Sequence, residues 1–208
     1  GGHTMLLDVE EWGYYRLLGA TRDDAAGEAF DKVAKMLGLP YPGGRHVENL
    51  ARGGDPSLFR FRHPMVKRSD TAADSDYYAF SFSGLKTAVL NAVRGSARME
   101  SDRASIARGF QDALIGSLVE KTLRAARAHG RDRIVLGGGV ACNKALVSAL
   151  AERAATIGAT VFAPSPRLAT DNAAMIARAG LFRHERGEHA GLDLNAYATQ
   201  PIPGLVAA

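Results

Sequence analysis

The sequence has 208 residues, 46% of them hydrophobic, which is enough for one large domain or two small ones with a buried core. The net charge of +4 permits an anionic partner without requiring one, and the single cysteine, Cys142, excludes an intrachain disulfide. No apolar run reaches the roughly 18–20 residues of a membrane span, and the start lacks the pattern of a secretory signal. We therefore expect a globular cytoplasmic protein without membrane contact.

The predicted elements begin with a β-hairpin. Two short apolar runs in residues 3–21 flank a turn at Trp12 and Gly13. Residues 23–39 place their apolar side chains on one stripe, which predicts a helix, and PYPGG at 40–44 ends it. A polar passage rich in glycine and arginine follows to residue 76, with a short helix expected near 46–52.

The second half of the sequence alternates strands and helices. Residues 77–93 read as a strand that turns into a helix at Ser83 or Gly84, and 102–129 predict a long amphipathic helix. Residues 132–166 have the order strand, glycine turn, helix, strand, which is the β-α-β unit of a parallel sheet. A last helix is expected in 170–187, and the tail from Leu192 is expected to be irregular.

The glycine turn VLGGGVACN at 135–143 is the strongest chemical pattern in the sequence. Three glycines after a buried strand let the backbone approach a ligand, and the following helix would offer unpaired N–H groups to a phosphate. Asn143 falls on the first turn of that helix, where its amide can donate and accept. Close packing of a strand on a helix also requires glycine, so the turn alone leaves both interpretations open.

Two further patterns each have a structural and a functional interpretation. On the helix 23–39, Asp31 could pair with Lys35 at i,i+4, or could bind ribose hydroxyls while PYPGG folds back beside the base. Ser83 and Lys86 have the spacing of acyl-serine enzymes, but no companion motif supports this, and Ser83 as an ordinary N-cap is favoured.

Asp171 stands between a threonine and an asparagine, where the last predicted helix starts. A carboxylate at this place can cap the helix or bind a cation, and the residues by themselves favour the cap.

Arginines are frequent between residues 94 and 133. Such a cluster could follow a phosphate backbone, although a solvated helix face is the simpler interpretation for each one. The arginines are Arg94, Arg98, Arg103, Arg108, Arg124, Arg127, Arg131 and Arg133.

Five blocks in chain order together resemble one family. The blocks are GGHT at 1–4, GEAFDKVAKMLGLPYPGG at 27–44, FSFSGLKT at 80–87, GGGVACN at 137–143 and TDNAAMIA at 170–177. On these blocks the chain is identified as a member of the tRNA N6-adenosine threonylcarbamoyltransferase family (TsaD), formerly described as a glycoprotease. The resemblance extends over residues 1 to about 185.

The resemblance implies an α/β fold of the actin-like ATPase superfamily, which includes sugar kinases and heat-shock ATPases. Such a fold has RNase H-like lobes, each with a mixed sheet and flanking helices. Residues 1–185 would form the C-terminal lobe, with a helical insertion at about 44–130, and 186–208 would form a tail. The N-terminal lobe would be absent from this chain.

The resemblance also implies a reaction, in which the threonylcarbamoyl group of threonylcarbamoyl-adenylate passes to N6 of adenine 37 of tRNA and AMP is released. It implies a divalent metal, iron or zinc, and three partners: tRNA, a smaller paralogous subunit and a P-loop ATPase. The implied site residues are Gly1 and Gly2 beside the acyl-phosphate, Asp31, Gly44 and Asn143 at the adenosine, and Asp171 as a metal ligand.

The sequence departs from the family pattern in two ways. The family's two other metal ligands are histidines of an HxxxH helix, and the sequence has no such spacing; the serine before GGHT and the strand that leads to it are also missing. We therefore expect a lobe that is inactive by itself. The alternatives are a metal-dependent endopeptidase, against which the missing histidine pair counts, and a scaffold that binds no adenylate through Asp31 and Asn143.

Overall fold

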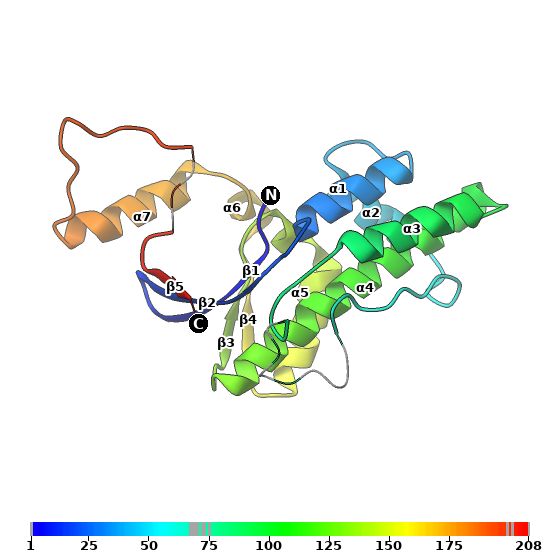
Figure 1. Ribbon diagram of the computed structural model, residues 1–208, viewed down its shortest axis with the longest axis horizontal. Coiled ribbons are helices and arrows are strands. Elements are labelled where there is room, and N and C mark those ends of the chain that lie inside the picture. Colours follow the sequence, from blue (N-terminus) through cyan, green and yellow to red (C-terminus); the bar gives the residue numbers. More distant parts are fainter. Residues whose placement is uncertain are drawn as a thin grey trace.

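The computed structural model describes residues 2–66, 71, 74, 76–198, 200 and 202–207. Within these ranges the strands form two sheets that helices cover (Figure 1). One sheet has the order β1-β2-β5, and the other pairs β3 with β4 in parallel. The strands are β1 (Met5–Glu11), β2 (Tyr14–Ala20), β3 (Arg133–Val135), β4 (Thr160–Phe162) and β5 (Leu205–Ala207). This mixed α/β architecture agrees with the fold class expected from the sequence.

The predicted hairpin is confirmed by the antiparallel pair β1 and β2. Its turn has Gly13 at φ 89°, a left-handed conformation that favours glycine. The tail was expected to be irregular, and this is wrong at its end, because β5 pairs in parallel with β2. The N–H of Tyr15 donates to the carbonyl of Gly204 at 2.9 Å, which fixes the start of β5.

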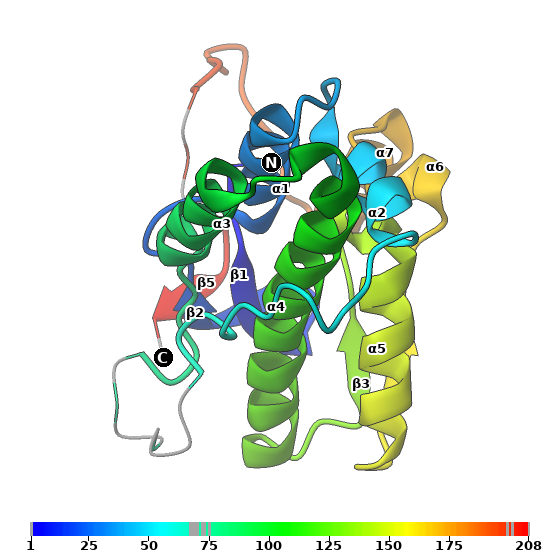
Figure 2. The same cartoon turned by 90° about the vertical axis from the view of Figure 1, so that its right-hand side faces the viewer.

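Four helices form the larger helical layer. The long helix α4 (Met99–Ala128) runs through it, and α5 (Lys144–Ala155) lies beside the second half of α4 (Figure 2). The predicted helices are confirmed with shifted starts: the first begins three residues later than expected, and the second and fourth begin three residues earlier. The four are α1 (Ala26–Met36), α2 (Gly43–Ala51), α3 (Ser83–Gly95) and α4 (Met99–Ala128).

The hydrophobic core has two parts that share α4. The first half of α4 packs with α1, α2 and α3, and the rings of Phe30 and Phe110 meet there edge to face at 5.2 Å. The second half packs with α5 and β3, where Leu123, Ile134 and Leu150 are buried. Because one helix contributes to both parts, the α1–α3 layer and the β-α-β unit are held to a common element.

The polar passage after α2 lies along α4 and fits against two glycines of that helix. A Cβ at Gly109 would lie 2.0 Å from the carbonyl oxygen of Phe59, and one at Gly116 would lie 2.4 Å from the ring of His63. The hydroxyl of Ser117 also donates to the carbonyl of Pro64 at 2.8 Å. The passage is therefore a packed strap, although its sequence shows little periodicity.

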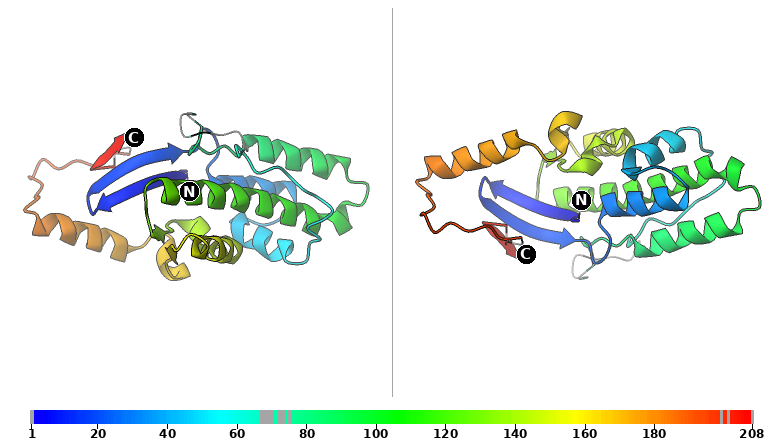
Figure 3. Two further views of the ribbon diagram at one scale, coloured as in Figure 1. Left: turned by 90° about the horizontal axis from the view of Figure 1, so that it is seen from below. Right: turned by 90° about the horizontal axis from the view of Figure 1, so that it is seen from above.

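The predicted β-α-β unit is confirmed. Between β3 and β4 the chain forms a 3-10 turn η1 (Gly139–Cys142) and α5 (Lys144–Ala155), and α6 (Pro166–Ala169) and α7 (Ala173–Glu185) follow β4. Helix α7 and strand β5 extend at the end where the β1-β2 hairpin turns, away from α3 (Figure 3). There the ring of Trp12 lies 5.3 Å from that of Phe182.

Candidate functional site

Asp31 of α1 holds the start of α2. Its Oδ1 accepts a hydrogen bond of 2.7 Å from the N–H of Gly43, and a Cβ at Gly43 would lie 3.0 Å from the Cα of Asp31. PYPGG therefore folds back on α1, as one of the two interpretations of Asp31 expected. The alternative pair of Asp31 with Lys35 does not form, whereas Lys32 pairs with Glu28 at 2.6 Å.

Helix α2 connects Asp31 to the start of α5. Gly44, the second residue of α2, has open space where a Cβ would stand. One turn further along, Glu48 accepts a hydrogen bond of 3.0 Å from the N–H of Lys144. Asp31 and Gly44 thus lie together at the start of α2, and Asn143 lies next to Lys144, which contacts α2 through Glu48.

Asn143 is the N-cap of α5 and is 7% exposed. Its Oδ1 accepts from the N–H of Leu146 at 2.9 Å, and its Nδ2 donates to Oε1 of Gln111 at 3.0 Å. The sequence predicted free N–H groups at this helix start, and this is wrong for Lys144 and Leu146, since a carboxylate and an amide oxygen already accept from them. Gln111 lies 32 residues earlier, and no sequence pattern connects it to Asn143.

The glycine turn after β3 borders a cavity. Gly137, Gly138 and Gly139 line it, and Gly138 has φ 79°, which favours glycine. Gly2 is exposed, with open space around its Cα, and its neighbour His3 lies at the cavity wall. Gly1 lies outside the described residues. The two predicted glycine turns therefore border one opening.

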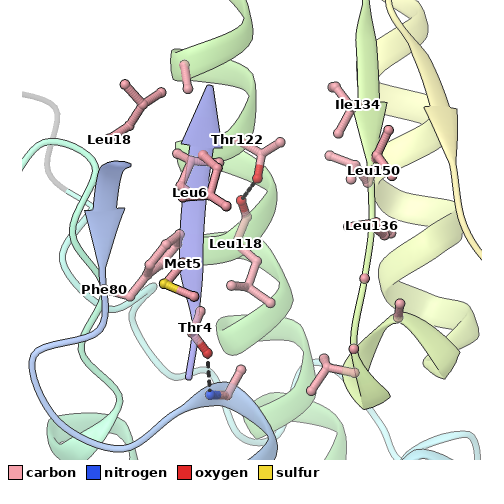
Figure 4. Close-up of a pocket in the computed structure, with 18 of the residues that line it drawn as sticks. Thr4, Met5, Leu6, Leu18, Phe80, Leu118, Thr122, Ile134, Leu136 and Leu150 are labelled. Atoms are coloured by element: carbon pink, nitrogen blue, oxygen red, sulfur yellow. Dashed lines mark hydrogen bonds between the residues drawn. The ribbon is translucent and has the colours of Figure 1, made fainter. Parts of the chain in front are cut away.

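The cavity of about 760 Å³ separates the two sheets. Consecutive residues of β1 form one wall, and β3 with the glycine turn forms the opposite wall (Figure 4). Its floor includes Leu118 and Thr122 of α4 and Leu146 and Leu150 of α5. Because consecutive residues of a strand line it on each side, the edges of β1 and β3 face one another across the cavity.

A charged group stands at the rim of the cavity. Asp8 of β1 is 4% exposed, and Arg131 donates to it through Nε at 2.7 Å and through an NH2 group at 3.2 Å. The guanidinium holds the pKa of Asp8 below its ordinary value, although burial acts in the opposite direction. His129 adds its Nδ1 at 3.7 Å. This group joins β1 to the end of α4 and was missed because its members lie far apart in sequence.

Ser83 and Lys86 serve structural contacts. Ser83 donates its hydroxyl to Asp23 at 2.7 Å, and Asp23 also accepts from the N–H of Phe82 at 2.8 Å. Lys86 instead contacts Asp24 at 2.7 Å. The two side chains therefore bind different carboxylates, and the N-cap interpretation of Ser83 is also wrong, because Ser83 is the first residue of α3.

Asp24 lies between two ammonium groups. Lys32 and Lys86 reach its two oxygens at 2.6 and 2.7 Å, and the carboxylate is 12% exposed. Lys32 first, and Lys86 next, lower the pKa of Asp24. The pair of lysines ties α1 to α3 through one carboxylate.

Asp171 does not cap α7. The N-cap is Asn172, whose Oδ1 accepts from the N–H of Met175 at 3.0 Å. Asp171 is exposed. Within the described ranges it has no hydrogen bond or ion pair, and no three side chains of His, Cys, Asp or Glu come together as a metal site. The residues present thus do not by themselves fit a metal ion.

The arginines that cluster in sequence separate in space. Arg98 precedes α4 and Arg127 lies near its end, so their backbones are about 44 Å apart along the helix. Four of the eight bind protein groups. These are Arg103 at Leu37 and Glu100, Arg108 at Asp112, Arg124 at Glu120 and Arg131 at Asp8. Arg94, Arg98, Arg127 and Arg133 are exposed, without an ion pair to the residues described.

The family model and the curated relatives that match this chain carry one name. Residues 1–178 match the family model of TsaD, tRNA N6-adenosine threonylcarbamoyltransferase. The chain is 62% identical over 213 residues to the tRNA N6-adenosine threonylcarbamoyltransferase of Gemmatimonas aurantiaca, covering 99% of this chain and 60% of that protein. It is 54% identical over 198 residues to the protein of that name from Anaeromyxobacter sp. (strain Fw109-5), covering 94% and 57%.

A solved structure shares the fold. The crystal structure of T. kodakarensis HypF superposes on 78% of this chain and 20% of its own, with a TM-score of 0.56 and 20% sequence identity. The chain spans about 60% of the length of the curated relatives that it matches. Every helix in the described part of the chain is too short or too polar to span a bilayer.

Proposed function

Because this chain belongs to the tRNA N6-adenosine threonylcarbamoyltransferase family, we propose that it is the nucleotide-binding lobe of an enzyme that transfers the threonylcarbamoyl group of threonylcarbamoyl-adenylate to N6 of adenine 37 in tRNA. The relatives carry this transferase name at 54–62% identity. The chain covers only part of each relative. Its threonylcarbamoyl donor and acceptor are therefore proposed from family membership.

The contacts of α2 support the proposal, because Asp31 binds its first residue Gly43 and Lys144, the residue after Asn143, binds its Glu48. Asp31 uses Oδ1 for Gly43, and Oδ2 accepts no hydrogen bond from the described residues. In this proposal Oδ2 accepts from a ribose hydroxyl. Gly44 lets the base approach the backbone, since the space beside its Cα is open. Asn143, the residue before Lys144, contributes its amide.

The reaction needs positioning and charge stabilisation more than a protein nucleophile. N6 of adenine attacks the carbamoyl carbon of the mixed anhydride, the bond from that carbon to the phosphate oxygen breaks, N6 loses a proton, and AMP leaves. The backbone of Gly137–Gly139 lines the opening where the acyl-phosphate would lie, and Gly2 directly precedes His3, which also lines it. Ser83 has no part in this proposal, because its hydroxyl donates to Asp23.

We assign Asp171 as one ligand of a divalent metal, iron or zinc. Its carboxylate is exposed and unpaired among the described residues, so it can take a ligand role without breaking a contact. One carboxylate is too few for a site, because zinc normally takes three or four protein ligands. The remaining ligands would have to come from outside the described residues, and no step of the reaction is assigned to this group here.

The cavity between β1 and β3 supports a further part of the proposal. The resemblance implies a strand that leads into the GGHT turn, and this turn stands at the cavity. Such a strand would run antiparallel to β1 and would pair with the open edges of both β1 and β3, which joins the two sheets into one. Leu118, Leu146 and Leu150 would then pack under it.

The proposed partners are tRNA, a smaller paralogous subunit and a P-loop ATPase, acting in the bacterial cytoplasm. The exposed arginines at the two ends of α4 are candidates for phosphate contacts, although they lie too far apart to form one patch.

Nucleotide titration tests the binding role. Calorimetry should show AMP binding by the wild-type chain that Asp31→Ala and Asn143→Ala abolish. A scaffold would bind no AMP, or would bind it equally well with both substitutions. A second assay supplies the chain with threonylcarbamoyl-adenylate and unmodified tRNA. We expect no turnover by this chain alone, and full turnover would overturn its assignment as an incomplete lobe.

A further inference from the structure

The side-chain amide of Asn143 is held in one orientation by two groups from different elements. The N–H of Leu146 can donate only to the oxygen of the carboxamide, so Oδ1 of Asn143 must face α5. Its Nδ2 then faces α4, where Oε1 of Gln111 accepts at 3.0 Å. The backbone of α5 therefore sets which atom of Asn143 each neighbour meets.

The buried position of Gln111 is energetically unfavourable for a polar side chain. It lies in the middle of α4 and is 4% exposed, in a part of the helix whose buried residues include Phe110 and Leu114. A buried amide is destabilising unless it is hydrogen-bonded, so an apolar residue would suit packing better there. The oxygen of Gln111 is bound by Asn143, which gives the polar side chain a reason to be in the core.

We propose that Gln111 is a positioning residue for the nucleotide, which acts by fixing the carboxamide of Asn143. This inference rests on the proposed function, because it takes Asn143 as a nucleotide contact. A carboxamide has two N–H groups and two oxygen lone pairs. With one of each used by Gln111 and Leu146, one N–H and one lone pair remain for an adenosine group that both accepts and donates.

Without Gln111 the carboxamide would keep only the Leu146 contact. Rotation about the bond between Cβ and the amide carbon would then be restrained only by the hydrogen bond that Oδ1 accepts. Nδ2 would no longer be held in a fixed direction. A ligand that needs the donor and the acceptor together would have to order the amide on binding, which weakens affinity.

Two substitutions at Gln111 separate positioning from packing. Gln111→Met keeps the length of the side chain and removes the acceptor, whereas Gln111→Glu keeps an oxygen acceptor for Nδ2. A matched control is Ser117→Ala, which removes another buried hydrogen bond from α4, the one to Pro64, six residues after Gln111. Each variant is first checked for folding by circular dichroism.

The first readout is the pair of side-chain amide proton resonances of Asn143 in ¹⁵N-labelled chain. We expect Gln111→Met to shift the resonance of the bonded proton and to speed its exchange with water. Gln111→Glu should preserve the slow exchange, and Ser117→Ala should leave both resonances in place. Unchanged resonances in Gln111→Met would overturn the proposal.

The second readout is AMP affinity by calorimetry. We expect Gln111→Met to bind AMP about tenfold more weakly, Gln111→Glu to recover most of this, and Ser117→Ala to stay within about twofold of the wild type. Equal losses in Gln111→Met and Ser117→Ala would indicate a general loss of stability and overturn the positioning role.

A wild-type chain that binds no AMP would defeat the proposed function by itself. The amide resonances would then still show whether Gln111 holds Asn143, so the two failures are distinguishable. If Gln111→Met fails to fold, Gln111→Glu alone decides, because loss of slow amide exchange in that variant contradicts an acceptor role.

Discussion

Oδ1 of Asp31 accepts a hydrogen bond of 2.7 Å from the backbone N–H of Gly43, so one side chain of α1 fixes the point at which α2 begins. Asp31→Ala leaves that N–H without its acceptor. We expect the free energy of unfolding to fall by about 1–2 kcal/mol, measured by urea denaturation. Asp31→Asn retains an oxygen acceptor and should lose less.

The matched control is Asp112→Ala, which removes a carboxylate from an exposed i,i+4 pair with Arg108 on α4. We expect a change below about 0.5 kcal/mol there. Equal effects of Asp31→Ala and Asp112→Ala would show that the contact to Gly43 contributes nothing specific.

Substitutions of Lys86 and of Ser83 should have different effects. Lys86→Met leaves Asp24 with Lys32 alone, in a site where the carboxylate is 12% exposed, and should cost about 1–2 kcal/mol of stability. Ser83→Ala should leave threonylcarbamoyl transfer intact when the lobe is supplied within a complete enzyme. Loss of turnover in folded Ser83→Ala protein would restore the acyl-serine hypothesis.

Stability should fall in acid because Asp23 and Asp24 have lowered pKa values. Burial would raise the pKa of Asp23, but the hydroxyls of Ser81 and Ser83 and two backbone N–H groups lower it below its ordinary value. For Asp24 the cause is Lys32 and then Lys86. The unfolded chain therefore binds protons at a higher pH than the folded chain.

The stability from these carboxylates is complete above the unfolded pKa of about 3.9 and is lost as pH falls through the lower folded value. Urea midpoints measured from pH 7 down to pH 2 should show this loss. Asp24→Asn should be less stable at pH 7 and should depend less on pH below 4. A parallel acid profile in the variant would contradict the role of Asp24.

Gly204→Ala should detach β5. A Cβ at this residue would lie 1.7 Å from the carbonyl oxygen of Gly13, and Gly204 has φ 78°. We expect the Tyr15 amide, which donates to Gly204, to exchange rapidly with water, as hydrogen exchange would detect. Gly180→Ala in α7, where a Cβ meets open space, is the control and should not alter that exchange.

A chain extended upstream of Gly1 to include the proposed strand should gain hydrogen-exchange protection along β1 (Met5–Glu11) and β3 (Arg133–Val135). The physical reason is that backbone groups at both cavity edges would acquire partners. The amides of α3, which lies away from the cavity, serve as the internal reference. No gain at β1 and β3 would show that the strand lies elsewhere.

Local patterns were enough to predict the hairpin, the β-α-β unit and the helices, because alternation and helical periodicity act within short windows. The same local patterns did not predict the strand in the tail. β5 has three residues and depends on Tyr15, about 190 positions earlier in the chain, so no local signal predicts it. Asp31 and Asn143 were placed by resemblance to the family, and their chemistry alone left other interpretations open.

The contacts missed from the sequence are those between distant positions. Gln111 and Asn143 are 32 residues apart, and Asp24 and Lys86 are 62 apart. One interpretation of the sequence offered the first N–H groups of α5 to a phosphate, but Glu48, 96 residues before Lys144, accepts from one of them. Such pairings are set by how helices pack and have no short-range pattern.

The facing edges of β1 and β3 can also pair with a strand from another molecule. Each edge presents a row of backbone donors and acceptors toward the cavity, and a strand from any source can satisfy them. In a concentrated solution the nearest source is another molecule of the same chain, so self-association would grow with concentration and bury the GGHT and GGG turns. Covering these edges should therefore keep the chain monomeric and the proposed nucleotide site accessible.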